Sequence, residues 1–228
     1  MLLCYITDRT LLADDEATRR KNLLARIESA AGAGIDFIQL REKDLSAREL
    51  EKLASQAMAL VARFPKSKLL INSRLDVALA VSAHGVHLRA EDFPAGDARA
   101  IADKAGKQIV IGVSCHSAKE VALAESHGAD FALLGPIFEK RGEALAPLGL
   151  EELRRASVRR VAAASRMPVL ALGGVNLANA RDCVLASADG VAGIRLFQDS
   201  AMSKTVRQLR SLAPSPATSV RRHPYHPR

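Results

Sequence analysis

Aromatic residues are scarce in this chain of 228 residues: tryptophan is absent, and phenylalanine and tyrosine make up 4% of it. Few rings are therefore available for the bases of single-stranded nucleic acid to stack on. No run of 18 or more apolar residues occurs, so we expect no transmembrane helix. The first ten residues, MLLCYITDRT, lead into an acidic segment and not into the cleavage site of a signal peptide. These absences favour a cytoplasmic protein with no membrane partner.

Cysteine is also rare. The three cysteines, Cys4, Cys115 and Cys183, are odd in number and widely spaced, and each has apolar neighbours. This pattern argues for reduced thiols and against a disulfide framework or a zinc site.

The net charge of +8 is unevenly distributed. Residues 213–228 are rich in proline and serine and carry three arginines without an acid, which predicts a disordered basic tail after a single domain over 1–212. A second surplus of arginine lies in 151–166, where a helix facing water accounts for it. We therefore do not expect a nucleic-acid partner.

A recurring phrase organises the chain. It is seen in AGAGIDFIQL (31–40), AVSAHGVHL (80–88), ESHGADFALL (125–134) and LASADGVAGI (185–194). Each copy has the small residues of a helix end, a glycine stop and then a short apolar strand. The repetition indicates that one strand–helix unit is reused.

Strands are predicted near 3–6, 36–41, 68–72, 85–88, 109–114, 131–136, 168–173 and 190–194, with helical patterns between them. Apolar strands with little alternation are typical of parallel sheets that are buried on both faces. Eight such units predict an α/β fold, a closed (β/α)8 TIM barrel, and the open doubly wound sheet is the alternative.

Basic side chains follow the second and sixth predicted strands: Arg41, Lys43 and Lys140. In (β/α)8 barrels the chemistry lies at the carboxyl ends of the strands, so these cations can converge there. Such a cluster can stabilise a pyrophosphate leaving group. The alternative is a surface ion-pair network with the neighbouring acids Glu42, Asp44 and Glu139.

A pair of glycines follows the seventh strand. Gly173 and Gly174 allow backbone N–H groups to approach an anion, and a helix predicted to begin near Asn176 would add its dipole. Together with Ile194 and Arg195 after the eighth strand, this loop predicts a phosphate site. A plain tight turn is the alternative.

Three further residues have open roles. Asp92 is a candidate Mg²⁺ ligand, and equally a turn or capping residue before Pro94. His116 is a candidate general acid or base, or a hydrogen-bonding group at a helix end. His87 lies within a predicted strand, where we expect a packed, hydrogen-bonded histidine.

Several ordered motifs together resemble one family: YITDR (5–9), QLREKD (39–44), INSRLDVALA (71–80), GVHLRAED (85–92), IGVSCHS (111–117), GADFALLGPIF (128–138) and ALGGV (171–175). The sequence resembles the thiamine phosphate synthases and their sister group, the thiazole tautomerase-like proteins. The resemblance implies a transferase that joins hydroxymethylpyrimidine pyrophosphate to thiazole phosphate, yielding thiamine phosphate and pyrophosphate.

The resemblance also implies roles for single residues. It places the pyrimidine pyrophosphate against Gln39, Arg41, Lys43, Asn72 and Ser114. It places Mg²⁺ on Asp92, and the thiazole phosphate on the backbone around Gly173, Gly174, Ile194 and Arg195.

The sequence departs from the family pattern in four places. Asn-Ser-Arg (72–74) replaces Asn-Asp-Arg, and Arg-Ala-Glu-Asp (89–92) replaces Gly-Gln-Glu-Asp. A shortened EKRGEALA segment replaces Thr-x-Thr-Lys, with Lys140 as the counterpart of its lysine, and Arg195 replaces a serine. One expected metal carboxylate is therefore missing.

These departures leave two other functions open. One is a tautomerase-like enzyme in which His116 moves a proton without a metal. The other is a non-catalytic binder of phosphorylated thiamine precursors. The sequence leaves the oligomeric state undecided, a homo-oligomer included.

Overall fold

The computed structural model describes residues 1–139, 146–162, 167–198 and 201–212. The strands are β1 (Leu2–Ile6), β2 (Phe37–Leu40), β3 (Lys68–Asn72), β4 (Gly85–Leu88), β5 (Val110–Cys115), β6 (Phe131–Leu134), β7 (Val169–Ala171) and β8 (Gly190–Gly193). The helices are α1 (Glu16–Gly32), α2 (Ala47–Val61), α3 (Leu75–Ala80), α4 (Ala95–Lys104), α5 (Ala118–Ser126), α6 (Gly149–Ala162), α7 (Ala180–Leu185) and α8 (Met202–Ser211).

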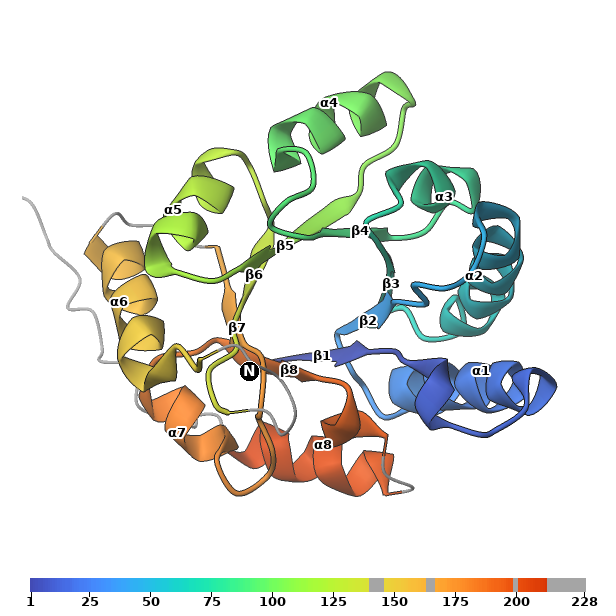
Figure 1. The fold of residues 1–228 in the computed structure, drawn as a ribbon. Helices are drawn as coiled ribbons and strands as arrows, with labels where there is room; N and C mark the ends of the chain where they lie inside the picture. The colour runs from blue at the N-terminus through green and yellow to red at the C-terminus, as the bar shows by residue number, and fades with distance from the viewer. Residues whose placement is uncertain (140–145, 163–166, 199–200, 213–228) are drawn as a thin grey trace, which may run out of the picture.

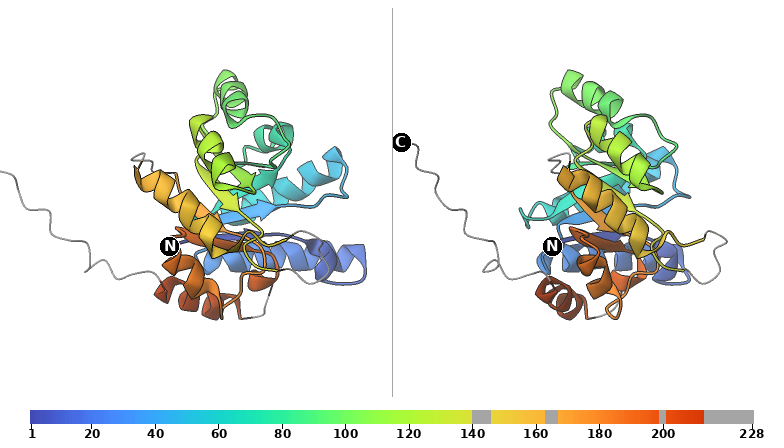
Figure 2. Two further views of the ribbon diagram at one scale, coloured as in Figure 1. Left: turned by 60° about the vertical axis from the view of Figure 1, so that its left-hand side comes forward. Right: turned by 90° about the vertical axis from the view of Figure 1, so that its left-hand side faces the viewer.

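The strands form a closed parallel barrel. Each strand pairs with the next one along the chain, and β1 also pairs with β8, with Leu2 opposite Gly190. The helices surround the strands as a ring (Figure 1). The further views place α1 beside α8, against which it packs, so the first and last helices complete the ring (Figure 2). The predicted TIM barrel is therefore confirmed, and the open sheet is excluded.

Helix α2 illustrates how the sequence specifies the outer layer. Ser46 and Glu49 form a reciprocal capping box at its start, which satisfies backbone donors that the first turn leaves free. Leu50, Leu53 and Ala57 then recur on one face and are buried. This apolar stripe packs the helix against the strands.

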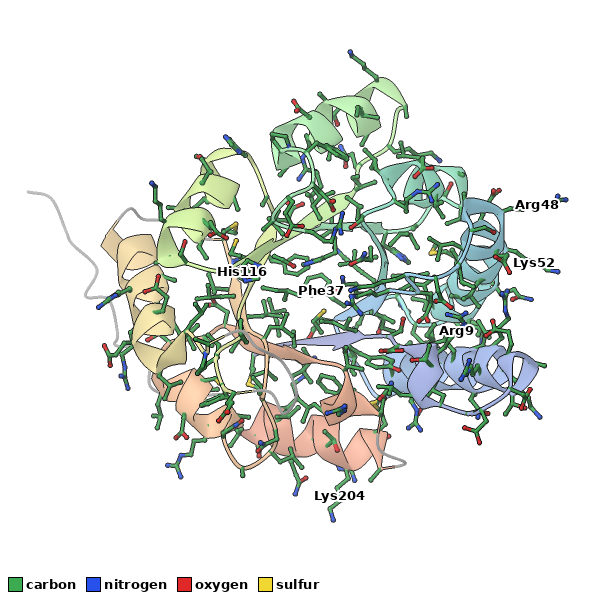
Figure 3. All side chains as sticks on the ribbon, viewed as in Figure 1. Arg9, Phe37, Arg48, Lys52, His116 and Lys204 are labelled. Carbon is green, nitrogen blue, oxygen red and sulfur yellow. The ribbon has the colours of Figure 1, made fainter. Side chains whose placement is uncertain are left out.

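The barrel interior holds a separate apolar cluster formed by Cys4, Ile6, Leu70, Phe131, Leu133, Leu170 and Ala192. Phe37 stacks on Phe131 with ring centroids 4.5 Å apart, and Figure 3 shows Phe37 in the middle of the ring of helices. Gly112 makes room for this packing, because a Cβ atom there would lie 2.3 Å from Cζ of Phe131 and 2.7 Å from Nδ1 of His87. The apolar cluster closes the barrel beneath the polar side chains at its carboxyl end.

The three cysteines are free and buried, as predicted. Within the described ranges, no helix is both long and apolar enough to cross a membrane. The predicted tail, 213–228, lies outside the described residues, so the domain boundary at residue 212 stays a prediction.

Candidate active site at the carboxyl ends of the strands

Arg9, a buried arginine in the loop after β1, fixes the position of the loop after β2. Arg9 donates to Asp44 at 2.7 and 2.8 Å and to Glu42 at 3.2 Å, and it also pairs with Glu16. The side chains of Arg9 and Glu42 are only 3% and 1% exposed. The acids after β2 therefore pair with Arg9, so the predicted ion-pair network of Glu42 and Asp44 with Arg41 and Lys43 is wrong.

The electrostatics of this loop follow from burial and from Arg9. Burial raises the pKa of Glu42, and hydrogen bonds from Thr7 and Arg9 oppose that shift only in part. A hydrogen bond from Arg9 lowers the pKa of Asp44. Thr7 donates to Glu42 at 2.5 Å and accepts from the backbone N–H of Arg41 at 2.9 Å. The network thus fixes the backbone from which Arg41 projects.

Arg41 and Lys43 remain available for a ligand. Neither side chain makes an ion pair with another residue in the described part of the chain. Arg41 is half-buried, and Lys43 is exposed. No role was predicted for Arg9 from the sequence, although its position in the YITDR motif (5–9) was a usable signal.

Gln39 and Asn72 join the ends of β2 and β3. The Gln39 amide donates to Oδ1 of Asn72 at 2.7 Å, and the Asn72 amide donates to the Ser73 hydroxyl at 3.1 Å. Oε1 of Gln39 is buried without a hydrogen-bond partner among the described residues. Buried polar atoms are normally paired, so this oxygen is suited to receive a donor from a ligand.

His87 and Ser114 join β4 and β5 in the same way. Nε2 of His87 lies 2.9 Å from the Ser114 hydroxyl, whereas Nδ1 is buried without a partner in the described part of the chain. His87 is therefore packed as predicted, but only one of its two ring nitrogens has a hydrogen-bond partner within the described ranges. Burial lowers the pKa of His87 to about 3, with opposing influences from the charges of Asp92 and Arg41, which shows that both charges lie near the imidazole.

Asp92 lies in the loop after β4 and is bound by Arg89. Its Oδ2 accepts from the Arg89 backbone at 2.8 Å, and its Oδ1 accepts from the guanidinium at 2.9 and 3.2 Å. Burial tends to raise the pKa of Asp92, but hydrogen bonds from Arg89 and Ser73 outweigh it and lower that pKa below its usual value. The turn role predicted as one alternative matches these contacts, although Asp92 does not cap α4, whose N-cap residue is Pro94.

His116 follows β5 and is exposed. Its Nδ1 lies 2.6 Å from the carbonyl oxygen of Gly135, and its backbone N–H donates to Glu120 at 2.7 Å. Because a carbonyl only accepts, Nδ1 carries a proton and Nε2 is left for other contacts. His116, Ser114, Arg89 and Asp92 line one cleft of about 360 Å³.

The glycine loop after β7 lines a larger cavity of about 530 Å³. Gly173, Gly174, Ile194 and Arg195 all contribute to its wall. Both glycines adopt positive φ, and a Cβ on Gly174 would lie 2.7 Å from the Cβ of Phe138, so only glycine fits there. The predicted phosphate-site residues therefore share a single cavity.

The helix predicted near Asn176 begins later than expected. The Asn176 side chain accepts from the backbone of Ala178 and Asn179, which forms a turn, and α7 begins at Ala180 with only six residues. The predicted contribution of a helix dipole to this cavity is therefore wrong. The loop must contact an anion through its own backbone and through Arg195.

The structure thus brings most predicted site residues to the same end of the barrel, after the strands β2, β3, β4, β5, β7 and β8. Lys140 lies outside the described residues. Within the described ranges, no three His, Cys, Asp or Glu residues cluster as metal ligands.

Comparisons with known proteins agree with this architecture. Residues 4–197 match the family described as thiamine monophosphate synthase. The thiamine-phosphate synthase of Moorella thermoacetica is 38% identical over 192 residues, covering 83% of this chain and 87% of that protein. That of Chloroflexus aurantiacus is 36% identical over 217 residues, covering 93% and 96%.

A solved structure is also similar. Thiamine phosphate pyrophosphorylase from Pyrococcus furiosus superposes with a TM-score of 0.74 at 31% identity, covering 92% of this chain and 94% of that chain. The family predicted from the sequence motifs is confirmed: the chain belongs to the thiamine monophosphate synthase family.

Proposed function

We propose that this chain is a thiamine-phosphate synthase that joins hydroxymethylpyrimidine pyrophosphate to thiazole phosphate. One observation carries the proposal: a glycine-lined cavity and a set of cationic and amide side chains lie at the same end of the barrel. Two phosphorylated substrates need two such subsites side by side. Relatives named thiamine-phosphate synthase, similar over most of their length, support the same activity.

In this reaction the thiazole nitrogen attacks the methylene carbon of the pyrimidine, and the carbon–oxygen bond to pyrophosphate breaks. Pyrophosphate leaves with the bonding electron pair, so negative charge grows on it in the transition state. Arg41 and Lys43 stabilise that charge, together with Lys140, for which the role rests on the family resemblance. Gln39 and Asn72 orient the pyrimidine, since the free Oε1 of Gln39 can accept from its amino group.

Ser114 belongs to the pyrimidine subsite and lines the cleft after β4 and β5. Its hydroxyl meets the neutral His87 imidazole at 2.9 Å, which fixes its orientation. The thiazole phosphate occupies the cavity after β7 and β8, where the backbone of Gly173 and Gly174 approaches it closely and Arg195 supplies a positive charge.

The predicted Mg²⁺ site does not fit the residues around Asp92. Both carboxylate oxygens accept hydrogen bonds from Arg89, and the second expected ligand position holds the neutral Ser73. Mg²⁺ prefers carboxylate oxygens that are free to coordinate it. We therefore assign no step of the reaction to a metal ion.

The test is to supply the purified chain with both substrates and to follow thiamine phosphate and pyrophosphate by chromatography. Arg41→Gln should lower turnover by about 100-fold, in line with the loss of one charged transition-state contact. Arg48→Gln is the matched control, because Arg48 is an exposed arginine of α2 that points away from the barrel (Figure 3).

Absence of thiamine phosphate from the wild-type reaction, with and without Mg²⁺, would contradict the proposal. The tautomerase-like alternative is tested separately with the thiazole carboxylate phosphate precursor. Aromatisation that is lost in His116→Ala would favour it, since Nδ1 of His116 donates to Gly135 and Nε2 is free to accept a proton from the substrate. Binding of thiazole phosphate without either reaction would favour the non-catalytic alternative.

A further inference from the structure

The loop after β4 carries a fixed positive charge where a metal site would require a free carboxylate. Arg89 donates hydrogen bonds to Asp92 from its backbone N–H and from two guanidinium nitrogens, at 2.8 to 3.2 Å. The nearby Ser73 hydroxyl also helps to lower the pKa of this carboxylate. Both carboxylate oxygens of Asp92 thus accept hydrogen bonds from Arg89 and hold its side chain in place.

The guanidinium itself is accessible. The Arg89 side chain is 57% exposed, whereas that of Asp92 is 10% exposed, so the carboxylate is mostly covered and the cation faces outward. Nη1 of Arg89 has no hydrogen-bond partner within the described ranges. An arginine held on one edge and open on the other is ready to donate to a phosphate oxygen.

The cleft beneath this guanidinium contains predicted catalytic residues. Arg89 lines it together with Ser114 and His116. Ser114 in turn contacts Nε2 of His87 at 2.9 Å, and the charge of Asp92 acts on the same imidazole. Arg89 therefore shares its cleft with Ser114, a side chain that the resemblance assigns to the pyrimidine substrate.

We propose that Arg89 is a catalytic residue that takes the place of a divalent cation and neutralises the leaving pyrophosphate directly. The inference rests on the proposed function and deepens it, because it makes the reaction independent of added metal. The bond between the methylene carbon and the pyrophosphate oxygen breaks, and pyrophosphate takes the electron pair. Arg89 donates hydrogen bonds to that oxygen and loses no proton, since arginine stays charged at neutral pH.

Direct binding of inorganic pyrophosphate tests the role of Arg89 apart from turnover. Calorimetry in EDTA should detect binding to the wild-type chain, and Arg89→Gln should weaken it at least about tenfold through loss of a charge-assisted contact. Arg154→Gln is the matched control, because Arg154 also pairs with an acid three residues away, Glu151, but lies on α6. It should bind pyrophosphate like the wild type.

Turnover provides the second measurement. The wild-type rate in EDTA should stay within about threefold of the rate in Mg²⁺, and Arg89→Gln should lose about 100-fold in both. The double variant Arg89→Gly, Ser73→Asp removes the arginine and supplies a second carboxylate, so its turnover should require Mg²⁺. Circular dichroism of each variant checks that the barrel is folded.

Two results would overturn the inference: pyrophosphate that binds the wild type only with Mg²⁺, or Arg89→Gln that binds it in EDTA as tightly as the wild type. A chain that binds pyrophosphate through Arg89 but forms no thiamine phosphate would overturn the proposed function instead. The binding and turnover measurements therefore separate the two failures.

Discussion

At the scale of single residues, the alternating charges from Arg41 to Asp44 have two separate tasks. Glu42 and Asp44 turn toward Arg9 and fix the loop, whereas Arg41 and Lys43 stay unpaired within the described ranges. A buried ion pair stabilises a fold only weakly, but it costs several kcal/mol to remove one partner. The Arg9 pairs thus explain how two cations can be held beside each other at the barrel mouth.

His87 allows a prediction of pH dependence. Its pKa falls from an ordinary value near 6.5 to about 3 in the folded chain because it is buried. Between these values the unfolded chain binds a proton that the folded chain does not, so the free energy of unfolding falls as the pH falls. From pH 6.5 to 5 the loss should be about 2 kcal/mol, since each pKa unit corresponds to about 1.4 kcal/mol.

Urea unfolding at a series of pH values measures this effect. His87→Gln keeps a neutral polar group in the barrel, so its free energy of unfolding should depend less on pH over the same range. His127→Gln changes an exposed histidine at the end of α5 and should keep the wild-type slope. Equal slopes for the wild type and His87→Gln would show that His87 is not the group responsible.

At the scale of secondary-structure elements, the start of α2 depends on its capping box. The Ser46 hydroxyl accepts from the backbone of Glu49 at 3.3 Å, and Glu49 accepts from the backbone of Ser46 at 3.1 Å. Ser46→Ala should lower the free energy of unfolding by about 1 kcal/mol. Ser55→Ala, within the same helix, should cause no loss, because alanine is the better helix former. A loss equal for both variants in urea unfolding would contradict a specific capping role.

Most of the elements could be predicted from the sequence, because the strands are short and apolar, and several, such as β2, β4, β6 and β8, follow a helix end with a glycine stop. The start of α7 could not, since the hydrogen bonds of Asn176 to the following backbone form a turn that looks like helix onset in the sequence. The partner of Glu42 could not be predicted either. Arg9 is 33 residues away along the chain, and the pairing of β1 with β2 brings the two together.

At the scale of the whole molecule, the candidate site depends on closing the ring, because its two cavities lie after β4 and β5 and after β7 and β8. Arg210 of α8 secures that closure at the amino ends of the strands. It donates to the carbonyl oxygens of Met1 and Gly34 and to Asp36. Asp36 in turn accepts from the backbone of Leu3 at 2.7 Å. One side chain thus joins the last helix to β1 and to the start of β2.

Arg210→Ala should therefore lower the free energy of unfolding by roughly 2 kcal/mol, a modest value because the Arg210 side chain is 34% exposed. Lys204→Ala on the same helix removes a cation that points away from the barrel (Figure 3) and should leave stability within about 0.5 kcal/mol of the wild type. Urea unfolding followed by circular dichroism measures both. Because α8 closes the ring, the loss in Arg210→Ala should appear as one cooperative transition at lower urea. An early separate transition of α8 would mean that the helix is only an attachment to a barrel that closes without it.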